Sequence, residues 1–141
     1  MSELETKPLN WTPDPQVGYT VERRKDGGMQ YTFTDLSKHT LSHWRQFALE
    51  HLLGSDRLTR NLYDLREIEE ITDEAMSYAL EVGSDPSTRN IRLAVVVSNP
   101  DVQEKVLKIA DLANPAWLEI GVFESMALAE EWLNRPLTQL I

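Results

Sequence analysis

Ile91-Arg92-Leu93-Ala94-Val95-Val96-Val97-Ser98-Asn99-Pro100 is the stretch of sequence that decides the fold. Five consecutive residues in it, Leu93 to Val97, are apolar and rich in β-branched valine, and Asn-Pro closes the run. A run of this length and composition predicts a strand that is buried on both faces of its sheet. Such a strand needs helices on both sides, and amphipathic segments alternate with strand-like runs before and after it. The pattern therefore predicts an α/β layered domain.

The chain before this strand contains a predicted β-hairpin. Apolar and polar residues alternate over residues 17–21 and again over residues 29–33, and Asp26-Gly27-Gly28 lies between the two runs. Period-two alternation around a glycine turn is typical of two antiparallel strands with one face on the core. We expect these to be the first two strands, at or near an edge of the sheet.

Helices and strands alternate through the rest of the chain. The signals are capping residues, apolar residues three and four apart, and Gly or Pro where a helix stops. They predict a helix over about 38–53, a strand over 61–65 and a helix from Thr72, all before the buried strand. After it they predict a helix from Pro100 capped by Asn99, a strand over 117–123 and a last helix capped by Ser125. The inner faces of two of these helices are expected to be Met76, Ala79 and Leu80 in one, and Leu128, Ala129, Trp132 and Leu133 in the other. Short connections and right-handed crossovers make the later strands mostly parallel. The expected fold is a mixed sheet of four or five strands with an N-terminal hairpin and about four helices.

One domain accounts for most of the chain, because 141 residues is the usual size of a single domain. Pro8, Pro13 and Pro15 predict an irregular arm over residues 1–16. The domain is expected over 17–135, followed by a partly apolar tail over 136–141. Trp11 and the apolar residues of the tail lie outside the compact pattern, which leaves self-association as a homodimer open.

The composition excludes several classes of protein. The chain has no cysteine, so disulfides, thiolate metal sites and a cysteine nucleophile are ruled out. Lys and Arg total 14 against 23 Asp and Glu, and the resulting net charge of -9 opposes binding to nucleic acid. The first ten residues hold no apolar run that suits a signal peptide, and no later run suits a membrane span. We expect a cytoplasmic protein without membrane insertion.

Several of these segments together resemble a known family. They are the hairpin, the strand ending Asp64-Leu65, the helix entry Ile71-Thr72-Asp73-Glu74-Ala75, the valine-rich strand, and the closing stretch Val122-Phe123-Glu124-Ser125-Met126-Ala127-Leu128-Ala129-Glu130-Glu131-Trp132-Leu133. In this combination the chain resembles the STAS-like, SpoIIAA-like superfamily of anti-sigma-factor-antagonist domains over about residues 17–134. The resemblance implies a domain that is not an enzyme. It also implies binding to a partner protein, which phosphorylation of a serine at the start of the second helix switches off in the classical members.

The chain departs from the classical pattern at that serine. The regulated members carry an Asp-Ser-Ser-Gly-like segment where this chain reads Thr72-Asp73-Glu74-Ala75. Thr72 is the one hydroxyl in this neighbourhood, although it does not strictly occupy the place of the serine. A phosphate on it would be favoured by the helix N-terminus and opposed by the surrounding carboxylates. The resemblance is therefore closer to the uncharacterised branch of the superfamily, some of which has been compared with lipid-binding folds.

The carboxyl ends of parallel strands are where an open α/β sheet meets ligands and partners. We therefore expect a partner-binding or switch surface for a protein partner, formed by Asp64, Arg66, Thr72, Asp73, Ser98 and Asn99. Several of these residues, together with Ser125, also stand where helix caps belong, and capping is the simpler role for each of them.

A second hypothesis is a carrier or sensor of an apolar small molecule, such as a lipid or a fatty acid. If the helices leave a space unfilled above the sheet, Trp44 and Phe47 of the first helix and Met76 of the second would stand on its wall. The same residues serve equally well as ordinary core residues.

Catalytic and metal motifs are weak throughout. His39 and His43 stand four apart, which suits a metal pair, but the residues between them lack the glutamate of a zinc-protease helix. There is no Gly-x-Ser-x-Gly, and Asp26-Gly27-Gly28 belongs to a hairpin rather than to a phosphate-binding loop. We expect a protein that is not an enzyme and that uses no metal and no cofactor.

Overall fold

A computed structural model describes residues 16–52, 59–83, 91–112 and 118–135 of the chain. Within these ranges the elements follow one another in the order β1 (Tyr19–Arg23), β2 (Met29–Phe33), α1 (Lys38–Leu52), β3 (Thr59–Asp64), α2 (Asp73–Gly83), β4 (Ile91–Val96), α3 (Pro100–Leu112), β5 (Leu118–Phe123) and α4 (Met126–Leu133). Every helix and strand that the sequence predicts is present, with ends within two residues of those expected. The predicted arm up to residue 15, including Trp11, and the predicted tail lie outside the described residues.

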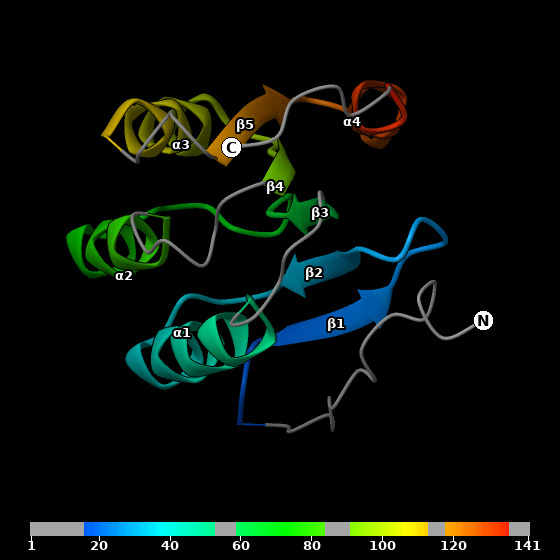
Figure 1. Cartoon of the computed structure of the whole chain (residues 1–141). Coiled ribbons are helices and arrows are strands. Elements are labelled where there is room, and N and C mark those ends of the chain that lie inside the picture. Colours follow the sequence, from blue (N-terminus) through cyan, green and yellow to red (C-terminus); the bar gives the residue numbers. More distant parts are fainter. Residues whose placement is uncertain (1–15, 53–58, 84–90, 113–117, 136–141) are drawn as a thin grey trace.

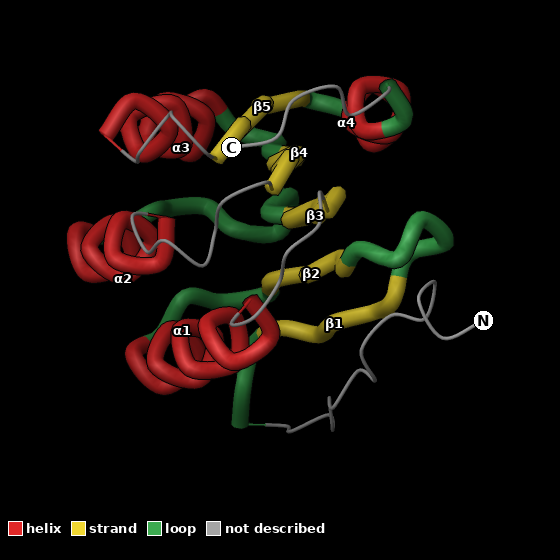
Figure 2. Tube along the Cα trace, in the orientation of Figure 1, coloured by secondary structure: helices red, strands yellow, loops and turns green. Residues whose placement is uncertain are grey.

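The five strands form one mixed sheet, in which they lie side by side in chain order. β1 pairs with β2 antiparallel, and each later neighbouring pair is parallel. Because each crossover moves on in the same direction and is right-handed, α1, α2 and α3 all lie on one face of the sheet. The helix α4 lies on the other face (Figure 1; Figure 2). The predicted α/β architecture, with the hairpin at an edge, is confirmed.

The hairpin turn depends on two glycines. Gly27 has φ 93°, a conformation that favours glycine, and its N–H donates to the carbonyl of Arg24. Gly28 lies so close to β3 that a Cβ added to it would overlap the carbonyl oxygen of Arg60. The turn therefore presses the hairpin against the neighbouring strand with no room for a side chain at residue 28.

The central strand β4 is buried on both faces, as its sequence predicts. Val95 belongs to the larger apolar cluster, which lies between the sheet and the three helices α1, α2 and α3. Ala94 and Val96 belong to a smaller cluster on the opposite face, where they pack against Ala129 and Leu133 of α4. Leu133 has no exposed surface.

The buried side of α4 differs from the prediction at one residue. Ser125 caps the helix as expected, because its hydroxyl accepts a hydrogen bond from the N–H of Leu128 at 3.1 Å. Ala129 is buried, but Leu128 is 54% exposed, so its predicted inward position is wrong. Adjacent residues of a helix are turned about 100° from each other, which takes Leu128 away from the stripe that Ala129 occupies.

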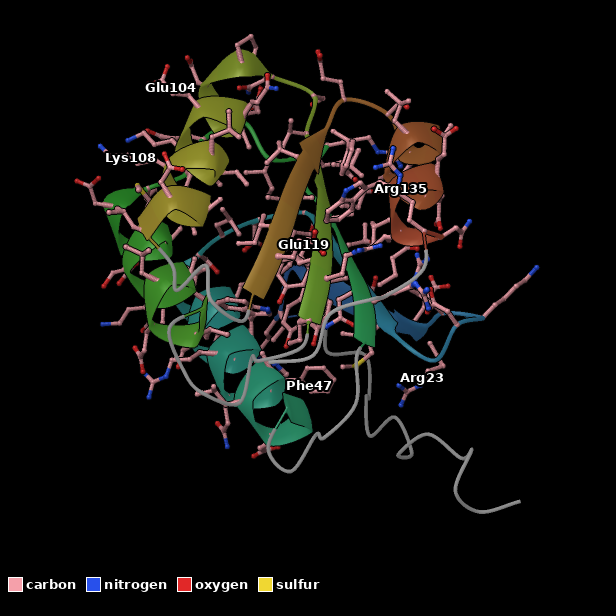
Figure 3. The ribbon with its side chains drawn as sticks, turned by 45° about the horizontal axis from the view of Figure 1, so that its top comes forward. Arg23, Phe47, Glu104, Lys108, Glu119 and Arg135 are labelled. Carbon is pink, nitrogen blue, oxygen red and sulfur yellow. The ribbon has the colours of Figure 1, made fainter. Side chains whose placement is uncertain are left out.

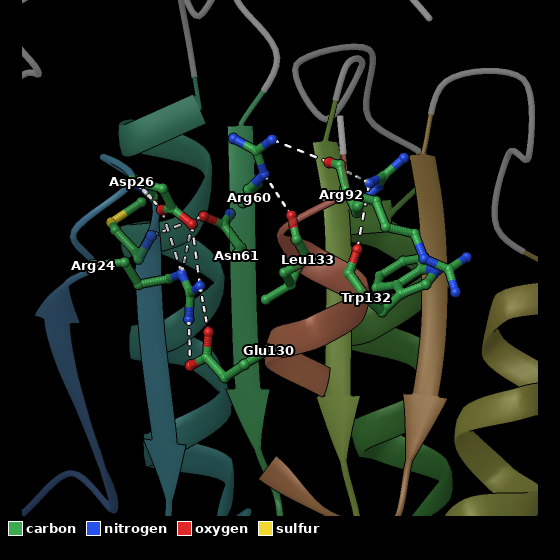
Figure 4. A network of polar contacts seen from close by, with 11 residues as sticks. Arg24, Asp26, Arg60, Asn61, Arg92, Glu130, Trp132 and Leu133 are labelled. Atoms are coloured by element: carbon green, nitrogen blue, oxygen red, sulfur yellow. Dashed lines mark hydrogen bonds and ion pairs between the residues drawn. The ribbon is translucent and has the colours of Figure 1, made fainter. Parts of the chain in front are cut away.

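An ion-paired network joins α4 to the hairpin. The Arg24 side chain is 8% exposed and donates two hydrogen bonds to the carboxylate of Glu130, at 2.8 and 3.0 Å (Figure 4). The same guanidinium donates to Asp26 in the turn, at 3.1 to 3.3 Å. The hydrogen bonds and charges from Glu130 and Asp26 raise the pKa of Arg24, against the effect of burial. The network therefore holds the first two strands against the last helix.

Two further arginines bind the C-terminal end of α4, where helix carbonyls lack partners. Arg60 of β3 donates to the carbonyl of Leu133, and its second donor reaches the carbonyl of Arg135 at 3.1 Å (Figure 4). Arg92 of β4 donates to the Arg135 carbonyl at 3.0 Å and lies over the Trp132 ring, 5.2 Å from its centroid.

None of the helices in the described ranges is long and apolar enough to cross a membrane.

Candidate functional site

The residues predicted to form a surface gather where β3 and β4 end. Asp64 closes β3 and is paired in register with Val96, which closes β4. The segments that follow the two strands therefore leave the sheet side by side. The loop over residues 65–72 connects β3 to α2, and Ser98 and Asn99 connect β4 to α3. Asp64, Arg66, Ser98 and Asn99 therefore lie at one edge of the sheet.

The loop over residues 65–72 is held in place from below. Its residues Leu65, Ile68 and Ile71 are buried, with exposed fractions of 7%, 4% and 7%. The N–H of Leu65 also donates to the carbonyl of Val96 at 2.8 Å, which extends the sheet pairing into the loop. A spacing of three residues thus turns the apolar side chains inward and the polar ones outward.

Ser98 and Asn99 tie the same loop to the start of α3. The Ser98 hydroxyl donates to the carbonyl of Arg66 at 2.6 Å, and the Asn99 side-chain amide donates to the carbonyl of Glu69 at 3.0 Å. The side-chain oxygen of Asn99 accepts from the N–H of Val102 at 2.9 Å, so Asn99 is also the cap of α3. Both residues therefore hold the loop, and only Asn99 caps a helix.

Thr72 caps α2 and remains exposed. Its hydroxyl oxygen accepts from the N–H of Ala75 at 3.1 Å. Asp73 is exposed in the first turn of the helix, where the helix dipole favours a negative charge. The capping role of Thr72 is thus present, and its side chain faces outward from the domain.

Asp64 and Arg66 form an ion pair at the start of the loop. The Asp64 carboxylate, 9% exposed, accepts from Nε and Nη2 of Arg66 at 2.9 and 2.8 Å and from the Arg66 N–H at 3.1 Å. Burial by itself would raise the pKa of Asp64. The hydrogen bonds and the charge of Arg66 outweigh burial and lower the pKa below its ordinary value.

We expect Asp64→Asn to lower the free energy of unfolding by about 1 kcal/mol at pH 7, a modest loss because Arg66 is half-exposed. Since the folded-state pKa of Asp64 is depressed, its stabilisation is complete above the pKa of the unfolded state and is lost as the pH falls through the lower folded value. Urea unfolding from pH 7 to pH 2 should therefore show the wild-type and D64N curves converging in acid. Glu104→Gln, on the exposed side of α3, is the control that should run parallel to the wild type. A D64N difference that stays constant with pH would contradict the ion-pair argument.

The outward side of this edge is acidic. Its exposed carboxylates are those of Glu67, Glu69, Glu70, Asp73, Glu74 and Asp101. The one cation among the predicted surface residues, Arg66, is already paired with Asp64. The edge therefore presents a fixed loop with a strong negative charge.

The two histidines with metal-like spacing do not form a site with other ligands. His39 is exposed, while Nδ1 of His43 is hydrogen-bonded to the hydroxyl of Tyr19 at 2.7 Å. Within residues 16–52, 59–83, 91–112 and 118–135 no group of three metal-ligating side chains occurs.

An apolar cavity of about 120 Å³ lies between the sheet and the helical layer. Of the three predicted pocket residues, Trp44 lines it, whereas Phe47 and Met76 are not among its lining residues. Phe47 is buried between α1 and the sheet (Figure 3), with its ring 6.0 Å from that of Tyr31.

Other cavity residues could have been found from local signals in the sequence. Asn61 and Tyr63 alternate with Leu62 in β3, which places both on one face of the sheet. Ala75 and Ala79 stand four apart on α2, where small side chains leave space next to the sheet. Of these four residues, only Ala79 is among those that the helical spacing assigned to an inner face.

Comparisons with known proteins bear on the fold. No protein-family model matches the chain, and no curated protein matches it in sequence. A solved structure does match: an uncharacterized protein from the DUF3478 family with a SpoIIAA-like fold, from Shewanella loihica PV-4, determined at 2.25 Å resolution. The TM-score is 0.61 at 17% sequence identity, and the match covers 82% of this chain and 91% of the other.

Proposed function

We propose, from the SpoIIAA-like fold of this chain, that it is a non-catalytic, STAS-like module that binds a protein partner through the acidic edge of its sheet. The observation that carries the proposal is the fixed loop over residues 65–72, with Thr72 and Asp73 beside it. The loop's own apolar side chains are buried in the core, and Ser98 and Asn99 donate hydrogen bonds to its backbone carbonyls. A loop held in this way binds without a large cost of ordering.

The charge of this edge suggests what kind of partner it takes. Glu67, Glu69 and Glu70 are exposed on the loop and Glu74 is exposed just after it, and the whole chain carries a net charge of -9. A protein with a basic surface would be steered toward this edge and oriented on it, and salt would weaken the encounter. The same charge opposes a phosphate on Thr72, so partner binding need not be regulated there.

We expect Glu70→Lys to weaken the binding of such a partner at least tenfold, because it places a cation among the exposed carboxylates of the acidic edge. The tagged chain, its E70K variant and a control would be used to capture proteins from the cells that make it, and the captured proteins would be quantified by mass spectrometry. The control is Glu104→Lys, the same change on a side chain that points out from α3 into solvent (Figure 3). A partner that both variants capture equally well would rule out this edge as the binding surface.

The carrier hypothesis is the second candidate, and the cavity above the sheet is the observation behind it. Its volume of about 120 Å³ is below the ~300–1,000 Å³ of typical pockets for drug-sized ligands. A long fatty-acid chain would therefore have to displace the helices to enter. We place this function after partner binding for that reason.

A further inference from the structure

The cavity has walls of two different kinds. The sheet and α1 contribute four aromatic side chains, those of Tyr31, Phe33, Trp44 and Tyr63, beside aliphatic ones such as Leu93 and Val95. The ring of Phe33 is tilted relative to that of Tyr63, with the two centroids 5.9 Å apart. The ring of Trp44 is nearly perpendicular to that of Tyr63, with the centroids 6.0 Å apart. Opposite these rings, Ala75 and Ala79 of α2 line the cavity. A ligand in the cavity would therefore meet ring faces and edges on one side and the small side chains of Ala75 and Ala79 on the other.

Small side chains on α2 explain why this space is unfilled. Within the helical layer α2 lies between α1 and α3 and packs against both. A helix at that position needs large inward side chains to reach the sheet, and an alanine has only its Cβ.

Two donors stand on the aromatic side, the half-buried hydroxyl of Tyr63 and the buried side-chain amide of Asn61. The Tyr63 hydroxyl accepts from Nε1 of Trp44 at 3.1 Å, and among the described residues no acceptor is found for its own proton. Asn61, 5% exposed, accepts from the N–H of Met29 at 2.9 Å through its side-chain oxygen, and no described residue accepts from its amide nitrogen. Burial raises the pKa of Tyr63 well above its ordinary value, so its proton is held at neutral pH. A buried donor without a partner costs about 1–3 kcal/mol, so the position of Asn61 favours an acceptor that is brought in, and the Tyr63 hydroxyl can donate to the same acceptor.

We propose that this cavity binds a small, uncharged aromatic compound that carries one carbonyl group. The volume suits a single ring, because an apolar cavity of about 150 Å³ takes up benzene. The ring packs among Phe33, Trp44 and Tyr63, which favour edge-to-face contacts. The carbonyl oxygen accepts from Tyr63 or Asn61. No charged side chain is found among the described residues of the lining, so a carboxylate or an amine would lose its hydration without compensation.

The experiment compares acetophenone with ethylbenzene, which has nearly the same shape and lacks the acceptor. Titration of each into the isotope-labelled chain, followed by two-dimensional NMR, gives the dissociation constants. We expect acetophenone to saturate the resonances of cavity residues and to bind about fivefold more tightly than ethylbenzene. Tyr63→Phe should weaken acetophenone about fivefold and leave ethylbenzene within twofold of its wild-type affinity, since only the hydroxyl is lost.

Ala79→Leu tests the site itself, because the larger side chain fills the cavity. It should weaken both probes at least tenfold, and Ala75→Val is the second filling variant if A79L does not fold. Ala127→Leu is the control, because Ala127 is exposed on α4 on the other side of the sheet. Two results would overturn the proposal: no saturable binding of acetophenone to the wild type, or unchanged binding to the folded filling variants. Neither result bears on partner binding, which the variants at Glu70 and Glu104 test separately.

Discussion

Replacement of Leu133 by alanine is expected to lower the free energy of unfolding by about 2–5 kcal/mol. Leu133 is fully buried, and it packs with Ala129 against Leu62, Ala94 and Val96 of the sheet. This cluster is small, and α4 supplies its helical side. The cavity left by the lost methyl groups therefore has few neighbours that can move in to fill it.

The same substitution at Leu128 is the matched control for Leu133. Leu128 lies on the same helix and is 54% exposed, so Leu128→Ala should change the free energy of unfolding by no more than about 0.5 kcal/mol. Urea unfolding followed by circular dichroism measures both variants under the same conditions. Similar losses in the two variants would contradict the assignment of Leu133 to the inner side of α4 and Leu128 to the outer side.

Gly28→Ala is expected to lower the free energy of unfolding by about 3 kcal/mol, at the upper end of the cost of overpacking. The added Cβ would overlap the carbonyl oxygen of Arg60 and come within 2.6 Å of its carbon. These are backbone atoms of β3, so the clash can be relieved only if the hairpin moves away from its neighbouring strand. The hydrogen bond from the Met29 N–H to Asn61 would then be lost as well.

Gly121→Ala distinguishes a backbone clash from ordinary crowding. A Cβ at residue 121 would meet ring atoms of Phe123 and Trp132 at 2.9 to 3.1 Å, and side chains can shift where a backbone cannot. We expect a loss of about 1 kcal/mol, clearly smaller than the loss from Gly28→Ala. Thermal unfolding of the two variants provides the comparison. If G121A were the more damaging change, the close approach of the hairpin turn to β3 would not be the constraint we describe.

The fold could be predicted from the sequence because its signals are local. The valine run of β4 shows burial on both faces, and the glycine turn shows the hairpin. Ser125 and Asn99 mark helix starts through a hydrogen bond to a residue three positions on, which needs no knowledge of the rest of the chain. The observed ends of the elements agree with these signals within two residues.

The candidate surface was also predictable in part, since the carboxyl ends of parallel strands always meet at one edge of a sheet. What the sequence could not show is the pairing there, such as the bond from the Ser98 hydroxyl to the carbonyl of Arg66. Side chains that cap or anchor in this way look the same in the sequence as side chains that bind a partner. Thr72 combines both features, because it caps α2 and is exposed.

Features that depend on distances between layers could not be predicted. Whether alanines on α2 leave a cavity depends on the distance between the helix and the sheet. The spacing of residues along the sequence does not predict that distance. Arg24 and Glu130 are 106 residues apart, so their ion pair has no local signature. The inward position predicted for Leu128 was wrong because the sequence does not show which part of the circumference of α4 the sheet covers. Leu128 lies outside that part and is exposed.

The order of the strands has a consequence for how the chain assembles as it is synthesised. Because β1 to β5 lie side by side in chain order, each newly made strand can join the exposed edge of the strands before it. The contacts of α4 and the residues just after it with the earlier strands span longer stretches of sequence, as in the bonds from Arg24 to Glu130, from Arg60 to Leu133 and from Arg92 to Arg135. These can form only after α4 has been synthesised. We therefore expect the sheet and its three helices to form progressively on the nascent chain, and the docking of α4 to be the final step that completes the domain.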